Sequence, residues 1–233
     1  MATVIEKSAA KVARGHTVYK NSAGKRVPGV TTITGVMEKG ALKYWANQLG
    51  LQGIKIREYV DALAQAGTLA HQMIQWHLEG VDREVEVMNQ YSQDTIDLAE
   101  TSALKFMYWQ ETVGYEPIFC EKQLVSDVHD YGGTIDGYGV CKKHKDIRIM
   151  LDIKTAKAIY DDMYTQVAGG YGLLMQEHGH EYDHVVIVRV GRSAEEGSEA
   201  EAKRCPCPEL HEKRFLVCRE LYELNKSITN ASK

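Results

Sequence analysis

Two short stretches near the middle of the chain carry residues whose types and spacing could perform hydrolytic chemistry. The first, YGGTIDGYG, places Asp136 in a glycine-flanked turn and strand, and the second, IRIMLDIK, places Asp152 and Lys154 two positions apart. Because side chains alternate across a strand, Asp152 and Lys154 would share the face opposite to the aliphatic side chains at the odd-numbered positions. Two carboxylates that meet at one point can hold a hard cation, and an ammonium group beside them suits metal-dependent cleavage of phosphodiesters.

The same three residues also have ordinary explanations. An aspartate beside a glycine can simply cap a turn. Asp152 and Lys154 could form a surface ion pair at the end of a strand, with little energetic consequence. A surface ion pair would not require alignment with Asp136, so the expected convergence of all three residues favours the metal hypothesis.

Hydrophobic periodicity outlines the elements that must position these residues. Strands are predicted near 117–126, 132–141, 147–154 and 184–191. The pattern further predicts a hairpin over 16–33, helices over 40–50, 56–80, 91–114 and about 160–178, a charged mobile loop over 193–204, a short strand at 203–207 and a final helix over 208–227. The sum is an α/β fold with a mixed central β-sheet flanked by helices, in which the N-terminal helices form an arch or wall beside the site.

Composition sets the broad class of the protein. A chain of 233 residues with 44% hydrophobic content can bury one good core, so we predict a single domain over 1–233 with a flexible N-terminus over 1–14. No apolar run approaches the roughly 20 residues that span a bilayer. The first residues also lack the apolar core of a signal peptide. We therefore expect a cytoplasmic protein with no membrane partner.

Four segments occur in an order that is typical of one nuclease family. They are RVPGVTTITGVMEKGALKYWA (26–46), GTLAHQMIQWHLEG (67–80), CEKQLVS (120–126) and LDIKTAKAIYDDMYTQVAGGYGLL (151–174). Together they resemble the PD-(D/E)XK nuclease superfamily, particularly its RecB-like exonuclease branch with phage-encoded and mitochondrial-genome-maintenance members. The resemblance runs from about Val18 to Leu174 and implies a restriction-endonuclease-like arrangement of the central sheet.

The resemblance implies a role for each candidate residue. The metal ligands would be His71, Glu121, Asp136, Asp152 and the backbone carbonyl of Ile153. Lys154 would sit beside the attacking water, where it can lower the pKa of the water and balance charge in the transition state. On the helix His71 shares a face with Gln75, whereas His77 points elsewhere, so we favour His71 as the ligand. Carboxylates with one imidazole suit one or two Mg²⁺ or Mn²⁺ ions better than a closed zinc site.

Gln166 would hydrogen-bond a phosphate or orient the catalytic lysine, but here the chain departs from the family pattern. The family spaces its glutamine and tyrosine by one helical turn, whereas Tyr171 follows Gln166 by five residues. On a regular helix that spacing turns the tyrosine about 140° away. Either the Gly169–Gly170 pair admits a bulge, or Tyr171 is a core residue, and we favour the second. The two glycines also suggest a close backbone approach to the sheet or to DNA.

The expected DNA contacts are Lys43, Trp45, Thr155, Lys157 and Tyr171. Trp45 could stack on unpaired bases, although an aromatic residue at this point is equally suited to core packing. Thr31 and Thr32 could donate to backbone phosphates or cap the following helix. Because the net charge is −4, we predict no large basic surface, and binding should rest on a narrow groove that also includes Lys39, Lys55 and Arg57.

Five cysteines raise the question of an iron–sulfur cluster, which some RecB-like nucleases hold. Cys205 and Cys207 are closely spaced, but Cys218 is distant from them and no cysteine precedes His71. We therefore expect no cluster and no structural disulfides. Cys218 is predicted to pack into the core from the terminal helix.

These observations lead to one functional prediction with two rivals. We predict a Mg²⁺- or Mn²⁺-dependent DNA exonuclease that acts on single strands or strand ends. The resemblance further suggests phage recombination or replication in the host cytoplasm, beside a single-strand-annealing or binding protein, with the oligomeric state open. The rivals are a structure-specific endonuclease on the same fold and a non-catalytic DNA-binding or inhibitor protein.

Overall fold

The computed structural model describes residues 17–37 and 40–232 of the chain. The N-terminal segment predicted to be flexible, 1–14, and the candidate DNA contact Lys39 lie outside the described residues.

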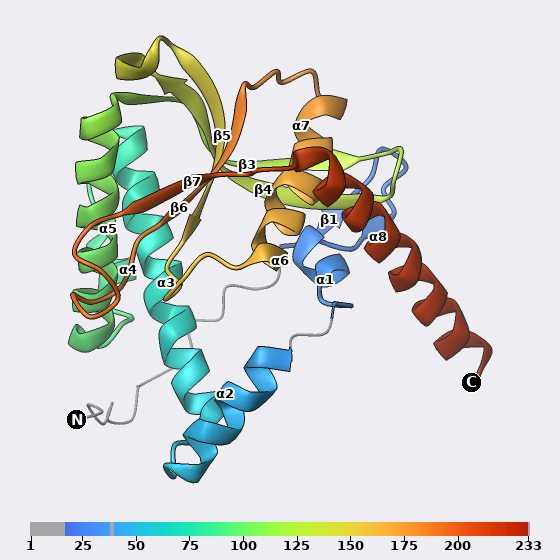
Figure 1. Ribbon diagram of the computed structural model, residues 1–233, viewed down its shortest axis with the longest axis horizontal. Coiled ribbons are helices and arrows are strands. Elements are labelled where there is room, and N and C mark those ends of the chain that lie inside the picture. Colours follow the sequence, from blue (N-terminus) through green and yellow to red (C-terminus); the bar gives the residue numbers. More distant parts are fainter. Residues whose placement is uncertain (1–16, 38–39, 233) are drawn as a thin grey trace.

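A mixed sheet of five strands forms the centre of the molecule (Figure 1). In spatial order its strands are β3 (Tyr115–Ser126), β4 (Tyr131–Cys141), β5 (Ile147–Lys154), β6 (His184–Arg189) and β7 (Glu201–Arg204). Only β5 and β6 are parallel, and a parallel pair needs a long crossover, which residues 155–183 supply. The predicted α/β class and mixed sheet are confirmed, and the arrangement is consistent with a restriction-endonuclease-like fold.

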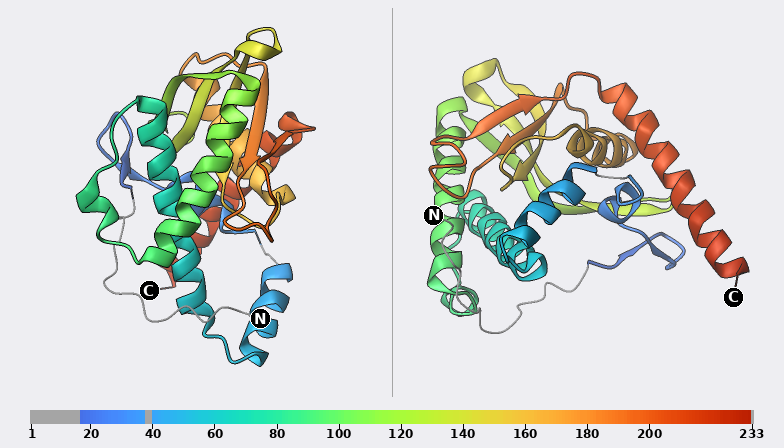
Figure 2. Two further views of the ribbon diagram at one scale, coloured as in Figure 1. Left: turned by 90° about the vertical axis from the view of Figure 1, so that its left-hand side faces the viewer. Right: turned by 60° about the horizontal axis from the view of Figure 1, so that its bottom comes forward.

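One face of the sheet is covered by two long helices, α3 (Ile56–Glu79) and α5 (Gln93–Val113), which lie side by side (Figure 2). The short helix α4 (Val85–Met88) lies between them in the chain. Ile149, Leu151 and Ile153 of β5 pack into the core under these helices, whereas Met150 faces the other side. The alternation predicted for this strand is therefore confirmed.

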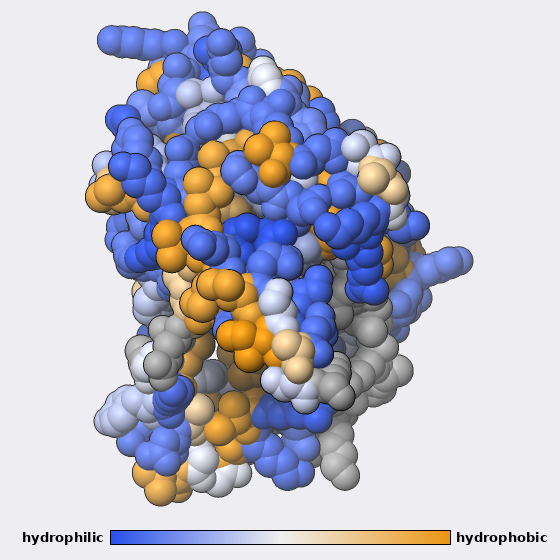
Figure 3. Space-filling view, turned by 90° about the vertical axis from the view of Figure 1, so that its right-hand side faces the viewer, coloured by the Kyte–Doolittle hydropathy of each residue, from blue (hydrophilic) through white to orange (hydrophobic). Residues whose placement is uncertain are grey.

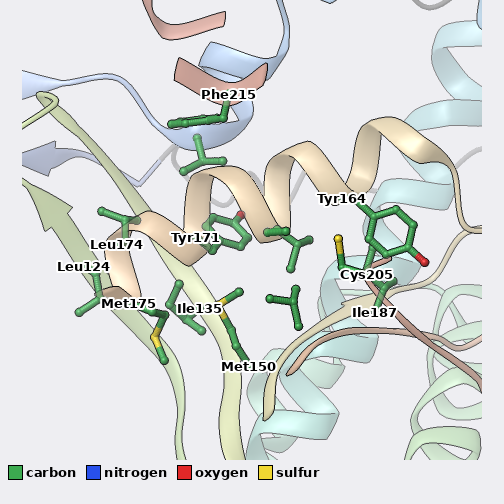
Figure 4. Packing of buried hydrophobic residues seen from close by; sticks show 14 of the residues in the cluster. Leu124, Ile135, Met150, Tyr164, Tyr171, Leu174, Met175, Ile187, Cys205 and Phe215 are labelled. Atoms are coloured by element: carbon green, nitrogen blue, oxygen red, sulfur yellow. The ribbon is translucent and has the colours of Figure 1, made fainter. Parts of the chain in front are cut away.

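The other face is covered by the crossover and by the last helix. The crossover consists of α6 (Asp161–Tyr164), a π-helix (Thr165–Tyr171) and α7 (Gly172–Glu177), and α8 (Pro208–Ala231) packs across it. Phe215 of α8, Leu174 and Met150 meet in this second core (Figure 4). Cys218 is buried in the same core, as predicted, and all five cysteines are free thiols.

The N-terminal segment forms the predicted hairpin, with shorter strands than expected. β1 (Tyr19–Lys20) and β2 (Arg26–Val27) pair antiparallel around a turn closed by a hydrogen bond from Gly24 to Asn21. Gly24 has a φ of 74°, which a glycine adopts without strain. The end of the predicted hairpin is instead the helix α1 (Val30–Thr34), because Val30 and Ile33, three positions apart, both bury their side chains.

α2 (Gly40–Leu51) and the first half of α3 project from the body as a helical arm (Figures 1 and 2). Most residues of α2 with a described side chain are exposed or half-buried. That this arm forms an arch or wall beside the site stays a prediction.

The charged segment 193–204 is tied to the body of the protein more closely than its sequence indicated. Lys105 of α5 donates hydrogen bonds to the carbonyl oxygens of Gly191, Ser193 and Gly197 at 2.9, 2.9 and 2.6 Å. The last residues of the segment, 201–204, form β7 at the edge of the sheet. The mobility predicted for this segment stays a prediction.

α8 leaves one apolar stripe uncovered along its length. Its exposed members are Leu210, Val217, Leu221, Leu224 and Ile228. Figure 3 shows apolar side chains gathered in a band on the side of the molecule where α8 lies. Within the described residues, no helix combines the length and apolar character needed to cross a membrane.

Candidate metal centre and active site

The candidate site lies where β4 and β5 separate. Their ladder runs from the Cys141–Ile147 pair to the Gly137–Leu151 pair and does not continue to Asp136. Here the side chain of Asp136 takes the place of a backbone acceptor, and its Oδ2 accepts the N–H of Ile153 at 2.8 Å. The sheet therefore opens at this point, with a carboxylate in the opening.

Glu121 reaches the same opening through an unusual backbone conformation. It lies on β3 between the paired residues Cys120 and Lys122, whose partners Gly137 and Ile135 flank Asp136. Its φ is 47°, a left-handed value that costs a non-glycine residue free energy and is often found at functional sites. This distortion, which no sequence pattern announced, places the Glu121 side chain beside that of Asp136.

His71 of α3 completes a group of three potential ligands. Its Nδ1 lies 3.7 Å from Glu121 Oε1 and 3.7 Å from Asp136 Oδ2. One ligand atom from each residue lies within 4.8 Å of the others, so a single cation could contact all three. His77, which we disfavoured, instead hydrogen-bonds Gln110 at 2.7 Å on another side of the helix.

Asp152 and Lys154 lie next to this group but do not belong to it. Asp152 is 1% exposed, and its Oδ2 lies 2.7 Å from the Nζ of Lys154. The contact is an ion pair whose angles depart from those of a hydrogen bond, and that oxygen has no other partner in the part of the chain described. The predicted approach of Asp136, Asp152 and Lys154 is thus seen, while ligation by Asp152 stays a prediction.

The three ligand types fit a hard divalent cation. Two carboxylates and one imidazole are ligands that Mg²⁺ and Mn²⁺ accept, and a third carboxylate, that of Asp152, lies beside them in an ion pair with Lys154. Ile153 contacts the site through its backbone N–H group, which donates to Asp136. The role predicted for its carbonyl oxygen stays a prediction.

Burial and the closeness of several carboxylates shift the pKa values of the group. Burial, and then the charge of Asp152, raises the pKa of Asp136 to about 7. Burial alone would lower the pKa of His71, but the carboxylates of Asp136 and Glu121 outweigh it and raise that pKa. Likewise the pKa of Lys154 is raised, because Asp152 and Asp136 outweigh the effect of burial. A cation bound here would relieve the repulsion between the carboxylates.

Gln166 and Tyr171 are brought together by the π-helix. Because this helix closes its hydrogen bonds five residues apart, the two side chains share a face, and Gln166 Nε2 donates to Tyr171 Oη at 2.8 Å. The π-helix is the bulge that we disfavoured, so the predicted rotation of Tyr171 away from Gln166 is wrong. Its ring does lie in the core, near Met150 and Phe215 (Figure 4), but its hydroxyl pairs with Gln166.

The charges of the site also affect the pKa of Tyr171. Burial, and then the charges of Asp152 and Asp136, raises the pKa of its hydroxyl, which therefore keeps its proton. The glycines before it permit a close approach, as predicted, but to other helices and not to the sheet. A Cβ at Gly169 would lie 2.5 Å from a carbonyl oxygen of α8, and one at Gly170 would lie 2.4 Å from Val30 of α1.

The remaining predicted DNA contacts are spread around the site. Lys43 and Trp45 lie on the arm, where the Trp45 ring is 6.1 Å from that of Tyr59 and is partly exposed. Lys157 is exposed in the segment after β5. Thr155 is half-buried against α3, since a Cβ at Gly67 would lie 2.7 Å from its hydroxyl. None of these placements tests DNA binding.

Sequence reasoning missed Tyr19 and Thr134. The Tyr19 hydroxyl lies 2.9 Å from Thr134 Oγ1, and Thr134 precedes Asp136 by two residues on β4. The signal available in the sequence was Gly132, since only a glycine leaves room for the ring of Tyr19 on β4.

Comparisons with known proteins supply no argument about the fold or the activity. No family model matches the sequence, and no curated protein is significantly similar to it. Among solved structures, that of SSO0001 is similar, with 11% sequence identity and a TM-score of 0.33 over 68% of this chain and 84% of that chain. A likeness this weak carries no argument about activity, so the function has to be argued from the site.

Proposed function

We propose that this protein is a deoxyribonuclease, dependent on Mg²⁺ or Mn²⁺, that hydrolyses phosphodiester bonds from strand ends. The observation that carries the proposal is the partly buried group of His71, Glu121 and Asp136 at the opening of the sheet, beside Lys154 and Asp152. Ionisable groups whose pKa values are shifted by burial and by one another gather preferentially at functional sites. The order of segments that resembles RecB-like exonucleases supports the choice of DNA ends over other phosphodiesters.

His71, Glu121 and Asp136 would hold the cation, with Asp152 and the carbonyl of Ile153 as further donors. When bound, such a cation activates water and neutralises charge on the phosphate. The strained backbone of Glu121 and the hydrogen bond from Ile153 to Asp136 fix both carboxylates before any cation arrives. This preorganisation reduces the cost of arranging ligands on binding.

Lys154 would act as a hydrogen-bond donor and a positive charge, not as a base. Its raised pKa keeps the ammonium group protonated at neutral pH. It can therefore orient the attacking water and stabilise charge that develops on the phosphate oxygens. Asp152, at 2.7 Å, holds the ammonium group in place.

Gln166 and Tyr171 would support this arrangement from the π-helix. The hydrogen bond between them fixes the amide of Gln166 at the edge of the site. The second hydrogen of that amide can then reach a phosphate oxygen or the lysine.

The test is digestion of oligonucleotides labelled at the 5′ or the 3′ end, single- or double-stranded, with Mg²⁺, Mn²⁺ or EDTA. We expect metal-dependent release of short products from linear DNA and none in EDTA. Covalently closed circular single strands should resist the enzyme, and their cleavage would favour the endonuclease alternative. Asp136→Ala and Lys154→Ala should abolish activity, whereas the exposed Asp82→Asn should leave it unchanged. Absence of product from every DNA with Mn²⁺ would overturn the proposal.

A further inference from the structure

A second cavity, distinct from the metal group, lies between the N-terminal hairpin, α1 and the C-terminal part of α8. It has a volume of about 630 Å³, within the range of pockets that bind small ligands. Its lining includes two cationic side chains, Arg26 and Lys226, and three threonines, at positions 17, 31 and 32. No aspartate or glutamate lies among the described residues that line it. The pocket is therefore suited to an anionic ligand that accepts hydrogen bonds.

Within the described residues, the two cations of the pocket have no acidic partner, unlike other cations nearby. The neighbouring Lys25 forms an ion pair with Asp130 at 2.7 Å, and Arg219 on α8 forms one with Glu223 at 2.8 Å. The side chains of Arg26 and Lys226 form neither an ion pair nor a hydrogen bond within residues 17–37 and 40–232. Their positive charge is thus available to a ligand.

One wall of the pocket is closely packed around Tyr19. The ring of Tyr19 lies against Gly29 and Gly132, where an added Cβ would come within 3.3 and 2.4 Å of it. These two glycines also form a bridge that joins the hairpin segment to β4. The Tyr19 hydroxyl is fixed by its contact with Thr134 at 2.9 Å. Tyr19 therefore holds one position relative to β4.

The same tyrosine connects the pocket to the candidate metal centre. Thr134 precedes Asp136 by two residues on β4, which corresponds to about 7 Å along a strand. Successive phosphates of a nucleic-acid strand recur every few ångströms, about 3.4 Å of axis per residue in a duplex. A strand with one phosphate at the metal group would thus have others within reach of the pocket.

We propose that this pocket is a phosphate-binding subsite for the nucleic-acid strand that is cleaved at the metal group. This inference rests on the proposed function and extends it by assigning Arg26, Lys226 and the threonines to the substrate backbone. The shared chemistry is a phosphate group, which could be an internal phosphodiester or a terminal phosphate.

The test is equilibrium binding of internally labelled single-stranded oligonucleotides to the full chain in EDTA, and again with Ca²⁺. Three oligonucleotides are compared: one with a 5′-phosphate, one with a 3′-phosphate and one with neither. The pocket variant is Arg26→Ala with Lys226→Ala. The matched control is Arg204→Ala with Lys213→Ala, which removes the same charge at exposed positions on β7 and α8 outside the pocket.

We expect the pocket variant to bind about 20-fold more weakly near 0.1 M salt and to lose about 1.4 from the slope of log K against log salt. The control should change affinity by less than about threefold, through long-range charge alone. An equal loss for all three oligonucleotides would identify an internal phosphate, and a loss confined to one end-phosphorylated oligonucleotide would identify a terminal phosphate. Thermal unfolding checks that both variants remain folded.

Equal effects in the pocket variant and the control, or no binding by the unmodified chain, would overturn the inference. Its failure can be separated from failure of the proposed function. Metal-dependent cleavage with no binding defect in the pocket variant leaves the nuclease intact without the subsite. A selective binding defect without cleavage of any DNA leaves the subsite and removes the nuclease.

Discussion

The Oδ2 of Asp136 accepts the backbone N–H of Ile153 at 2.8 Å, across the gap where β4 and β5 part. A side chain here replaces the backbone acceptor that a continuous ladder would have used. The carboxylate is therefore held by the sheet itself, on the side where His71 and Glu121 approach it. The position of the carboxylate is therefore set by the geometry of the two strands. Asp136 has two roles: its oxygen accepts a hydrogen bond, and its charge can bind a cation.

Replacing Asp136 with Asn should separate these two roles. The amide oxygen can still accept the N–H of Ile153, while the buried negative charge and its repulsion with Asp152 disappear. We expect cleavage to fall by about a thousandfold or more. In EDTA the unfolding temperature should rise by about 3 °C or more, because a charge that burial disfavours is removed.

The measurements are initial cleavage rates with Mn²⁺ and thermal unfolding in EDTA. Addition of Mn²⁺ should stabilise the unmodified protein and leave the variant almost unchanged. A variant that unfolds at a lower temperature in EDTA would show that Asp136 does not carry an unfavourable charge.

The ion pair between Lys154 and Asp152 gives a second prediction. Lys154→Met removes the ammonium group and leaves a carboxylate that is 1% exposed without its partner. Breaking one side of a buried pair costs about 3 kcal/mol or more in the free energy of unfolding. We expect that loss in denaturant unfolding, together with loss of activity.

Adding Asp152→Asn to Lys154→Met should restore most of the stability and none of the activity. Recovery of stability shows that the single variant suffers from an unpaired charge. Recovery of activity would contradict the role assigned to Lys154, since a structural ion pair would then account for both residues.

The sequence was sufficient where local patterns decide the outcome. The alternation of IRIMLDIK placed Met150 and the isoleucines of β5 on opposite faces correctly, because successive side chains of a strand point to opposite faces of the sheet. Likewise His71 could be chosen over His77, since helical spacing fixes which side chains share a face. In both cases one element contains the whole signal.

The sequence was insufficient where two elements interact. The left-handed backbone conformation of Glu121 depends on the neighbouring strand, and the segment CEKQLVS contains no residue pattern that predicts it. The π-helix is decided by packing, because Gly169 and Gly170 admit α8 and α1 so closely that a side chain at either position would collide. For that reason the five-residue spacing from Gln166 to Tyr171 did not by itself decide between a rotation of the tyrosine and the bulge that the structure contains.

His211 gives a prediction for the pH dependence of stability. The residue is 4% exposed, and its Nδ1 lies 3.1 Å from the hydroxyl of Thr165. Burial, and then the nearby charge of Arg214, lowers its pKa below the usual value of 6.5. Below pH 6.5 the unfolded state therefore binds a proton that the folded state rejects, so stability falls as the pH falls through that range.

His211→Asn keeps a polar atom near Thr165 and removes the titrating ring. We expect the unmodified protein to be more stable than the variant at pH 8, and the difference between their unfolding temperatures to shrink as the pH falls to 5.5. A difference that stays constant across this range would show that His211 does not titrate on unfolding.

Gly170 should tolerate no side chain, in contrast to Gly50 on the arm. A Cβ at Gly170 would lie 2.4 Å from Val30 and 3.0 Å from Phe215, both in the core, so Gly170→Ala should destabilise the fold by about 1–3 kcal/mol through overpacking. A Cβ at Gly50 would meet nothing within 4 Å, and Gly50→Ala should stabilise α2 by about 0.5–1 kcal/mol through helix propensity. Denaturant unfolding of both variants makes the comparison. Equal stability of the two variants would contradict the tight contact between the π-helix and α1.

Overpacking at Gly170 would also disturb the π-helix. Gly170→Ala should therefore reduce the rate of cleavage, whereas Gly50→Ala should leave that rate unchanged.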